Sequence, residues 1–203
     1  MLIDSYIQKA IKSFDTISYE RKIILLAISR FVENKLKTAG KAELNYICRH
    51  NSRRSHFGQI WGQTAASYYQ LKNVLTYSGG TEATAFNPNA IAAIQRVGFR
   101  VRKVDESMNP HYLVAYSASE PDIVCFSKTY NAVSNPQQGF CAVMTCTEAD
   151  GNCPIIAGAE LRVSCPYDDP KAFDGTQLQD AKYDERCLQI ATETLWAFSQ
   201  VKI

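Results

Sequence analysis

A short loop in the first quarter of the chain contains the residue types that thiol-based oxyanion chemistry requires. It begins at Cys48 and has five residues before an Arg–Ser pair at Arg54 and Ser55. Five residues let the backbone curl until its N–H groups converge above the sulfur, and a following helix directs its N-terminus at the same point. This Cys48 loop (residues 48–55) therefore predicts a nucleophile at the floor of a cradle for tetrahedral oxyanions.

The residues of the Cys48 loop have distinct expected roles. Positively charged neighbours favour the thiolate form of a cysteine, and we expect Ser55 to donate a hydrogen bond to it. Arg54 is the expected clamp, because a planar guanidinium matches two oxygens of the anion. Asn51 tolerates the left-handed conformation and can brace the loop. The other predicted substrate-binding residues are Arg49, His50, Ser52 and Arg53; for Arg49 and Arg53 a solvated surface charge is an equal alternative.

A candidate general acid lies in the segment Asp168-Asp169-Pro170. Thiolate attack on a phosphate ester needs an acid that protonates the leaving oxygen, and a carboxyl group on a loop can supply it. Pro170 favours an extended conformation at the residue before it. We therefore predict that Asp169 is the acid, although an Asp–Pro pair taken alone is only a turn signal.

Two further cysteines, Cys146 and Cys153, follow a predicted strand and are separated by six polar, turn-forming residues. If Cys48 carried an adduct, Cys146 could attack it and Cys153 could then attack Cys146, with a flexible loop carrying the disulfide outward. The alternatives are ordinary reduced loop cysteines, or a zinc site with Cys165 and His50, whose spacing is wrong for a closed site.

Composition narrows the function classes. The 203 residues are 46% hydrophobic and 21% charged. The net charge of +2 does not indicate a protein that binds nucleic acids or membranes in general. No signal peptide or membrane-length apolar run is evident, so we expect a soluble, cytoplasmic protein. Seven cysteines, an odd number, favour reduced thiols over a disulfide framework. Three of them are expected to be small core residues: Cys125, Cys141 and Cys187.

Hydrophobic periodicity predicts an α/β domain behind a helical extension. Residues 1–42 predict a hairpin of two helices with a linker at 35–40, and residues 43–203 predict the catalytic domain. Strands that alternate with helices favour a mainly parallel open sheet, whose ligands bind at the carboxyl ends of the strands. The predicted strands are 44–47, 74–78, 112–116, 122–126 and 140–146, and the later predicted helices are 57–71, 88–97 and 177–198.

Together these motifs resemble the low-molecular-weight protein tyrosine phosphatase superfamily and, within it, the thioredoxin-coupled arsenate reductases. The Cys48 loop matches the pattern Cys-x-x-Asn-Ser-x-Arg-Ser, and Asp169-Pro170 matches the general-acid loop of both branches. The cysteine pair ending at Cys153-Pro154 is typical of the reductases. The resemblance covers about residues 44–199 and implies a four-stranded, mainly parallel sheet flanked by helices, with neither a metal nor a cofactor.

The resemblance also implies a reaction. Cys48 would attack arsenate, Cys146 would attack the adduct and release arsenite, and Cys153 would leave a disulfide for thioredoxin, the implied partner, to reduce. Arg54 would hold the anion and Asp169 would act as the acid. Two alternatives stay open: a phosphatase that hydrolyses phosphomonoesters such as phosphotyrosine, in which the cysteine pair protects Cys48 from over-oxidation, and a non-catalytic oxyanion-binding module.

The chain departs from the family pattern at three places. His50 stands where a small glycine is usual, the N-terminal extension is not part of the minimal fold, and the stretch of about residues 100–138 is longer and includes a predicted strand pair. These departures bear on substrate access and size, and leave the nucleophile unchanged.

Overall fold

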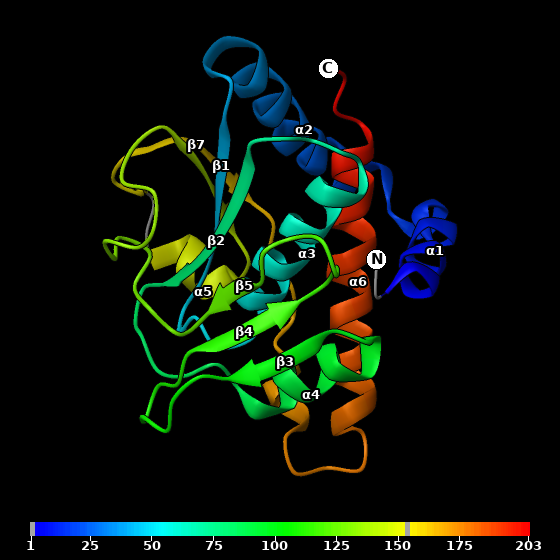
Figure 1. The fold of residues 1–203 in the computed structure, drawn as a ribbon, viewed down its shortest axis with the longest axis vertical. Coiled ribbons are helices and arrows are strands. Elements are labelled where there is room, and N and C mark those ends of the chain that lie inside the picture. Colours follow the sequence, from blue (N-terminus) through cyan, green and yellow to red (C-terminus); the bar gives the residue numbers. More distant parts are fainter. Residues whose placement is uncertain (1–2, 153–154) are drawn as a thin grey trace.

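The computed structural model describes residues 3–152 and 155–203 (Figure 1). After the first two helices, strands and helices alternate from β1 to α4, as the sequence pattern predicts, and four strands then follow in succession before α5. In chain order the elements are α1 (Asp4–Lys12), η1 (Phe14–Thr16), α2 (Tyr19–Ala39), β1 (Ala42–Cys48), α3 (Arg54–Tyr68), β2 (Val74–Gly80), α4 (Pro88–Val97), β3 (Arg100–Lys103), β4 (Tyr112–Ala115), β5 (Ile123–Cys125), β6 (Phe140–Met144), α5 (Thr147–Asn152), β7 (Ala159–Ser164), η2 (Pro170–Phe173) and α6 (Gln179–Ser199).

The central sheet has four parallel strands in the order β2-β1-β6-β7, which confirms the predicted sheet. In its register Ile47 lies opposite Met144, and Cys48 lies opposite Gly80. The carboxyl ends of β1, β2 and β6 therefore meet at one edge, and Cys48 is the last residue of β1. The prediction missed β7 because this edge strand is mostly half-buried or exposed and has no continuous apolar run.

Helix α3 packs on β1, β2 and α6, and nearly all its residues are buried. Two glycines allow this close approach: a Cβ on Gly58 would lie 2.4 Å from Cδ1 of Tyr46, and one on Gly62 would lie 3.0 Å from Cε2 of the same ring. Close packing on the sheet sets the N-terminus of α3 directly after the end of β1. The short loop between the two elements is thereby held in place.

The N-terminal helices α1 and α2 (blue in Figure 1) each pack on α6 (red), and α2 also contacts β1 and β7. Their apolar residues, such as Ile7 and Leu25, belong to the same core cluster as Leu44 of β1. The predicted linker at 35–40 is wrong, because α2 continues to Ala39 and ends at Gly40 in the left-handed conformation, with φ 68°. The division into units 1–42 and 43–203 stays a prediction.

Residues 100–125 contain a second, antiparallel sheet in the order β3-β4-β5. The predicted strand pair is confirmed as β4 and β5, whereas β3 was missed because its sequence Arg-Val-Arg-Lys is largely exposed and charged. After β5 the chain returns to the carboxyl end of β2, where the N–H of Gly80 donates to the carbonyl of Lys128 at 2.9 Å. The long stretch therefore supports the edge where Cys48 lies.

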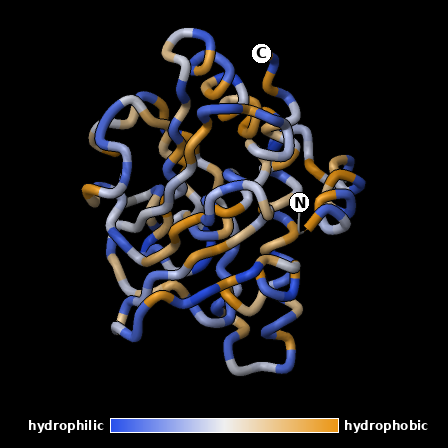
Figure 2. The backbone as a smooth tube through the Cα atoms, viewed as in Figure 1, coloured by the Kyte–Doolittle hydropathy of each residue, from blue (hydrophilic) through white to orange (hydrophobic). Residues whose placement is uncertain are grey.

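In Figure 2 hydrophobic (orange) and hydrophilic (blue) stretches are interleaved along the backbone. In the described part of the chain, no helix combines the length and apolar character needed to cross a membrane.

Candidate active site

Asn51 sets the shape of the Cys48 loop. Its φ of 44° lies in the left-handed region, as predicted for this residue type. Its side-chain Nδ2 donates to Oγ of Ser55 at 2.8 Å, and its Oδ1 accepts from the N–H of Lys128 at 2.9 Å. The amide therefore ties the loop both to the start of α3 and to the segment after β5.

Ser55 links this brace to the nucleophile. Its Oγ lies 3.1 Å from Sγ of Cys48, and both side chains are buried. Because Asn51 donates to the Ser55 oxygen, the Ser55 proton is free to point at the sulfur.

Several hydrogen-bond donors around Cys48 have no acceptor among the described residues. Within residues 3–152 and 155–203, no hydrogen bond uses the N–H groups of residues 50–53. Nε of Arg54 is buried and also has no partner. A buried donor left unpaired costs about 1–3 kcal/mol. This set of donors therefore fits an anion that would accept hydrogen bonds above the sulfur.

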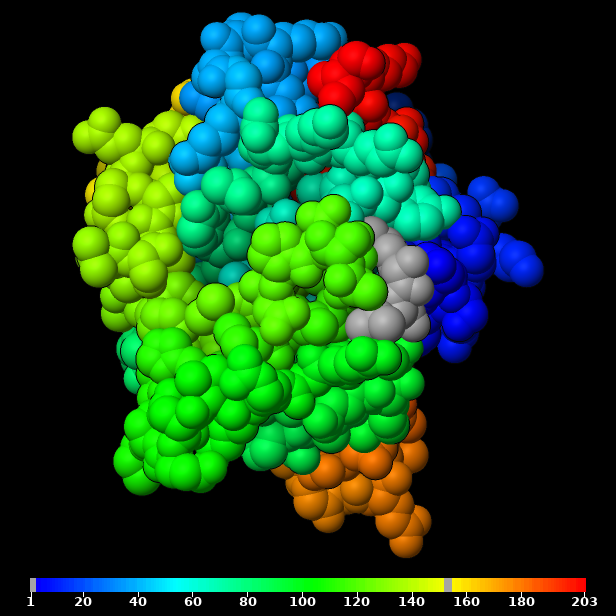
Figure 3. All heavy atoms as spheres, in the orientation of Figure 1, coloured from blue at the N-terminus to red at the C-terminus, as the bar shows by residue number. Residues whose placement is uncertain are grey.

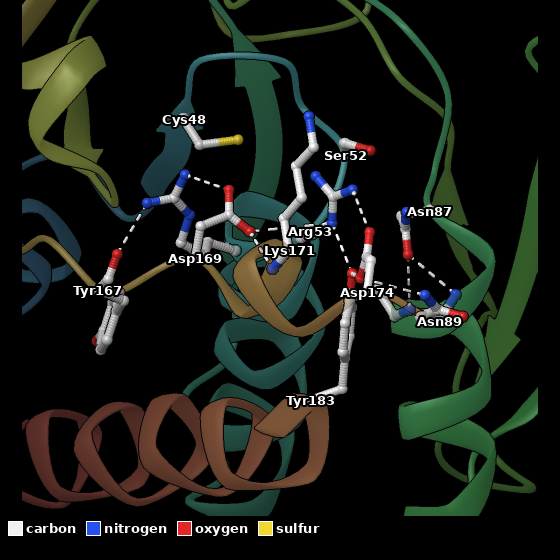
Figure 4. Close-up of polar contacts among 12 residues, drawn as sticks. Cys48, Ser52, Arg53, Asn87, Asn89, Tyr167, Asp169, Lys171, Asp174 and Tyr183 are labelled. Atoms are coloured by element: carbon white, nitrogen blue, oxygen red, sulfur yellow. Dashed lines mark hydrogen bonds and ion pairs between the residues drawn. The ribbon is translucent and has the colours of Figure 1, made fainter. Parts of the chain in front are cut away.

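Arg54 and Asp169 meet beside the sulfur although 115 positions separate them in the chain. Nη2 of Arg54 donates to Oδ2 of Asp169 at 2.7 Å, and Nη1 donates to the carbonyl of Tyr167 at 2.8 Å. Figure 4 shows the Asp169 carboxylate on the side of the cradle that the Cys48 sulfur faces. Asp169 is extended, with φ −80° and ψ 120°, as Pro170 predicts, and it caps η2 through Oδ1.

Arg53 serves a different part of the site. Its Nε donates to the hydroxyl of Tyr183 at 2.8 Å, and that hydroxyl donates to Oδ1 of Asp174, also at 2.8 Å (Figure 4). Nη2 of Arg53 lies 3.5 Å from Oδ2 of Asp174. The alternative of a solvated loop charge is wrong for Arg53, because its side chain is buried. Its guanidinium fastens the segment after Asp169 to α6.

The outer side of the loop packs on the segment after β2. Nε of Arg49 and Nε2 of His50 each lie 3.5 Å from the Glu82 carboxylate. Gly80 is required beneath them, because a Cβ there would lie 2.6 Å from the carbonyl oxygen of Arg49. The hydroxyl of Ser52 donates to the carbonyl of Ala85 at 2.7 Å. The side chains of Arg49, His50 and Ser52 thus contact this segment, and sequence reasoning gave no role to Glu82.

Cys146 lies close to Cys48 because their strands are neighbours. Both the N–H and the hydroxyl of Thr145 donate to the carbonyl of Ile47, at 2.7 and 2.9 Å. Cys146 is fully buried in the apolar cluster that contains Ile47, Cys48 and Met144. The chain that follows forms the short helix α5, where a flexible loop was predicted. Cys153 lies outside the described residues.

The environment of Cys146 keeps its thiol neutral. Burial raises the pKa of this thiol, and the nearby Cys48 acts in the same direction. Hydrogen bonds from the N–H groups of Ala149 and Arg49 and the charge of Arg54 lower the pKa by less. A neutral thiol beside the cradle does not repel an incoming anion.

The three cysteines that were predicted to be core residues are buried as expected: Cys125, Cys141 and Cys187. Cys165 is also buried, and its Sγ lies 3.6 Å from the hydroxyl of Tyr167. Among the described residues, no group of three or more His, Cys, Asp or Glu side chains is arranged to hold a metal ion.

The chain is similar to known proteins in sequence and in fold. No model of a known protein family matches the chain. Arsenate reductase 2 of Staphylococcus epidermidis is 27% identical over 140 residues, which are 68% of this chain and 86% of that protein. Arsenate reductase 1 of the same species is 28% identical over 155 residues, or 76% of this chain and 95% of that protein. A low-molecular-weight phosphotyrosine phosphatase from Vibrio cholerae has a TM-score of 0.50 at 13% identity, covering 78% of this chain and 94% of that one.

The chain has the low-molecular-weight phosphatase fold. The N-terminal helix α2 contacts the segment that leads to Asp169. Nε of Arg21 in α2 donates to Glu193 of α6 at 2.7 Å, and Nη2 donates to the carbonyl of Pro166 at 3.1 Å. The Arg21 guanidinium also lies 4.6 Å from the centroid of the Tyr167 ring. Sequence reasoning missed Arg21 because its partners lie more than 140 positions away.

We expect Arg21→Met to destabilise the protein by about 3 kcal/mol, because it leaves the buried Glu193 carboxylate unpaired. The measurement is urea denaturation followed by circular dichroism. Arg96→Met is the matched control. Arg96 also pairs with α6, through Asp184, but the side chains of Arg96 and Asp184 are 35% and 44% exposed. That variant should lose less than about 1 kcal/mol. Equal losses in the two variants would contradict a structural role for the Arg21 pair.

Proposed function

We propose that this protein is an arsenate reductase in which Cys48, Cys146 and Cys153 act in turn, with thioredoxin as the reductant. The observation that carries the proposal is the position of Cys146, buried in one cluster with Cys48 directly beside the anion cradle. A phosphatase needs one thiol, and a second thiol at this place suits a reaction that transfers electrons. Relatives named arsenate reductase, 27–28% identical to this chain, support the same function.

In the first step the Cys48 thiolate attacks arsenic in arsenate. Arg54 and the N–H groups of residues 50–53 hold the anion's oxygens. A sulfur–arsenic bond forms, and Asp169 donates a proton so that one oxygen departs as water. Arsenic stays in its oxidised, pentavalent state in this adduct.

In the second step Cys146, after losing its proton, attacks Sγ of Cys48. A disulfide forms, the sulfur–arsenic bond breaks, and its electron pair stays on arsenic, which leaves as trivalent arsenite. Cys153 then attacks Cys146 and releases Cys48 as a thiolate. The dithiol of thioredoxin supplies two electrons and two protons that reduce the remaining Cys146–Cys153 disulfide.

Variants of the cysteine pair test this proposal. In Cys146→Ser and Cys153→Ser, thioredoxin-coupled arsenate turnover should fall at least about 10³-fold, because the adduct has no thiol to resolve it. Hydrolysis of p-nitrophenyl phosphate should be unchanged, since it uses Cys48 and water. The second assay also serves as the control for folding. Full arsenate turnover in the double variant would contradict the reductase.

Hydrolysis of phosphomonoesters is the second candidate function. The observation that favours it is the Asp169 carboxylate, held by Arg54 at 2.7 Å beside the sulfur, because ester cleavage requires an acid for the leaving oxygen. In this case the pair would protect Cys48 from over-oxidation. Hydrolysis that depends on Cys48, Arg54 and Asp169, together with no arsenate turnover in the wild type, would favour the phosphatase.

A further inference from the structure

A second cavity, of about 790 Å³, lies along the outer edge of β2. It is lined by residues 74–77 of β2, by residues 120–124 with Phe126, and by residues of α3 that include Gln59 and Gln63. In Figure 3 the surface is hollowed between the cyan segment that joins α3 to β2 and the green segment around β4 and β5. The volume is in the range of small-molecule sites. Val74 pairs with Ala42 at the start of β1, so most of the cavity lies toward the end of the sheet opposite Cys48.

The polar groups in the cavity wall are largely satisfied by the protein. Oε1 of Gln63 accepts from the N–H of Thr76 at 3.2 Å, and its Nε2 donates to the carbonyl of Val74 at 3.3 Å. Nε2 of Gln59 donates to the carbonyl of Val124 at 3.2 Å. Much of the remaining lining is apolar, with Leu71, Val74, Tyr116, Ile123 and Phe126. Such a lining suits an apolar or aromatic body.

Lys128 is a buried charged residue in this wall, whereas the charged lining residues Lys72, Glu120 and Asp122 are exposed. The residue is only 7% exposed, and its Nζ lies 4.4 Å from the Phe126 ring centroid and 3.5 Å from the Phe126 carbonyl oxygen, at the limit of a hydrogen bond. No carboxylate of the described residues forms an ion pair with it. Burial lowers the pKa of Lys128 to about 8, so the amine is mostly charged at neutral pH.

The titratable neighbours of Lys128 do not supply a counter-charge. Burial raises the pKa of the Cys125 thiol to about 12, so this group is neutral. Burial and the lysine charge lower the pKa of His56, so its imidazole is neutral as well. A buried ammonium without an anion is costly. The charge plays no part in the contact of Lys128 with the Cys48 loop, because that contact is made by its backbone N–H, which any residue except proline would supply.

We propose that this cavity binds a small organic acid, with the carboxylate on Lys128 and an apolar or aromatic body along β2 and β5. The ligand carboxylate would supply the missing counter-charge, and Phe126 and Ile123 would cover the body. The ligand would lie outside the anion cradle, on the other side of the loop segment that Lys128 supports.

Binding of 2-naphthoate and of its neutral analogue 2-naphthamide tests the proposal by calorimetry. The titrations use the full chain with inorganic phosphate present in excess, so that the Cys48 loop is occupied. We expect naphthoate to bind at least about tenfold more tightly than naphthamide, because a charge-assisted contact is worth that much. Lys128→Met should remove this preference and leave naphthamide binding unchanged. Lys72→Met, an exposed lysine at the other end of the same cavity, should change neither.

Several results would overturn the proposal. These are equal affinities of naphthoate and naphthamide for the wild type, an unchanged naphthoate affinity in Lys128→Met, or no binding of either compound. A naphthoate signal that falls as phosphate rises would assign the binding to the Cys48 loop instead. The comparison of the two compounds on the wild type needs no variant, so it stands even if Lys128→Met does not fold. None of these results depends on arsenate or phosphate turnover.

Discussion

Cys48→Ser is expected to abolish both arsenate reduction and aryl-phosphate hydrolysis, with a loss of about 10⁵-fold or more. A serine hydroxyl at this position is ionised far less than a thiol. The groups around it are hydrogen-bond donors, apart from the Asp169 carboxylate, which is paired with Arg54. Ser55 and the loop N–H groups can stabilise an anion, but they cannot take a proton from a hydroxyl. The measurements are single-turnover p-nitrophenyl phosphate hydrolysis and thioredoxin-coupled arsenate reduction.

The control for Cys48→Ser is anion binding. The donors of residues 50–53 and Nε of Arg54 remain in this variant, so inorganic phosphate should still bind, as titration calorimetry can measure. Substantial turnover by the variant would mean that another thiol, with Cys146 the nearest candidate, attacks the anion. If the variant no longer bound phosphate, the substitution would have changed the conformation of the Cys48 loop as well as removing the thiol.

Arg54→Lys is expected to lower kcat/KM for either substrate by about 10³-fold. The guanidinium donates to the Tyr167 carbonyl and to Asp169 and still has a buried Nε free for the anion. A lysine ammonium donates from a single nitrogen. It cannot reach the Tyr167 carbonyl, the Asp169 carboxylate and the anion at the same time, as the planar guanidinium can. The loss should therefore exceed the effect of weaker anion binding alone, because Asp169 also loses its hydrogen bond from Arg54.

Arg49→Lys is the matched control for this variant. Arg49 belongs to the same loop, but its side chain is 45% exposed and lies 3.5 Å from Glu82. A charge-conserving change at an exposed pair should alter kcat/KM by less than about threefold. Steady-state kinetics on both variants decides the matter: equal effects at Arg49 and Arg54 would contradict the role of Arg54 as the clamp.

Features that depend on neighbouring residues were predicted well. The left-handed turn at Asn51, the extended backbone before Pro170 and the capped helix that begins at Pro88 all follow from local steric preferences. The buried strand β6 was found because it is a continuous apolar run, and β1 was found because its apolar residues directly precede the Cys48 loop. Strands β3 and β7 were not, because exposed edge strands have no such signal.

The sequence by itself determined the shape of the Cys48 loop, because the proposed nucleophile, the proposed clamp and the turn residue are contiguous and short-range sterics shape the backbone between them. Only the tertiary structure decided what surrounds that loop. Parallel strands bring Cys146 beside Cys48, and long-range packing turns Arg53 toward Tyr183 and Arg21 toward Glu193. Such contacts join residues more than 90 positions apart. The sequence around one of these residues does not indicate which distant residue it contacts. The physical reason is that the packing of helices and strands determines which distant side chains meet. The conformation of a short loop is determined by the steric preferences of its own residues.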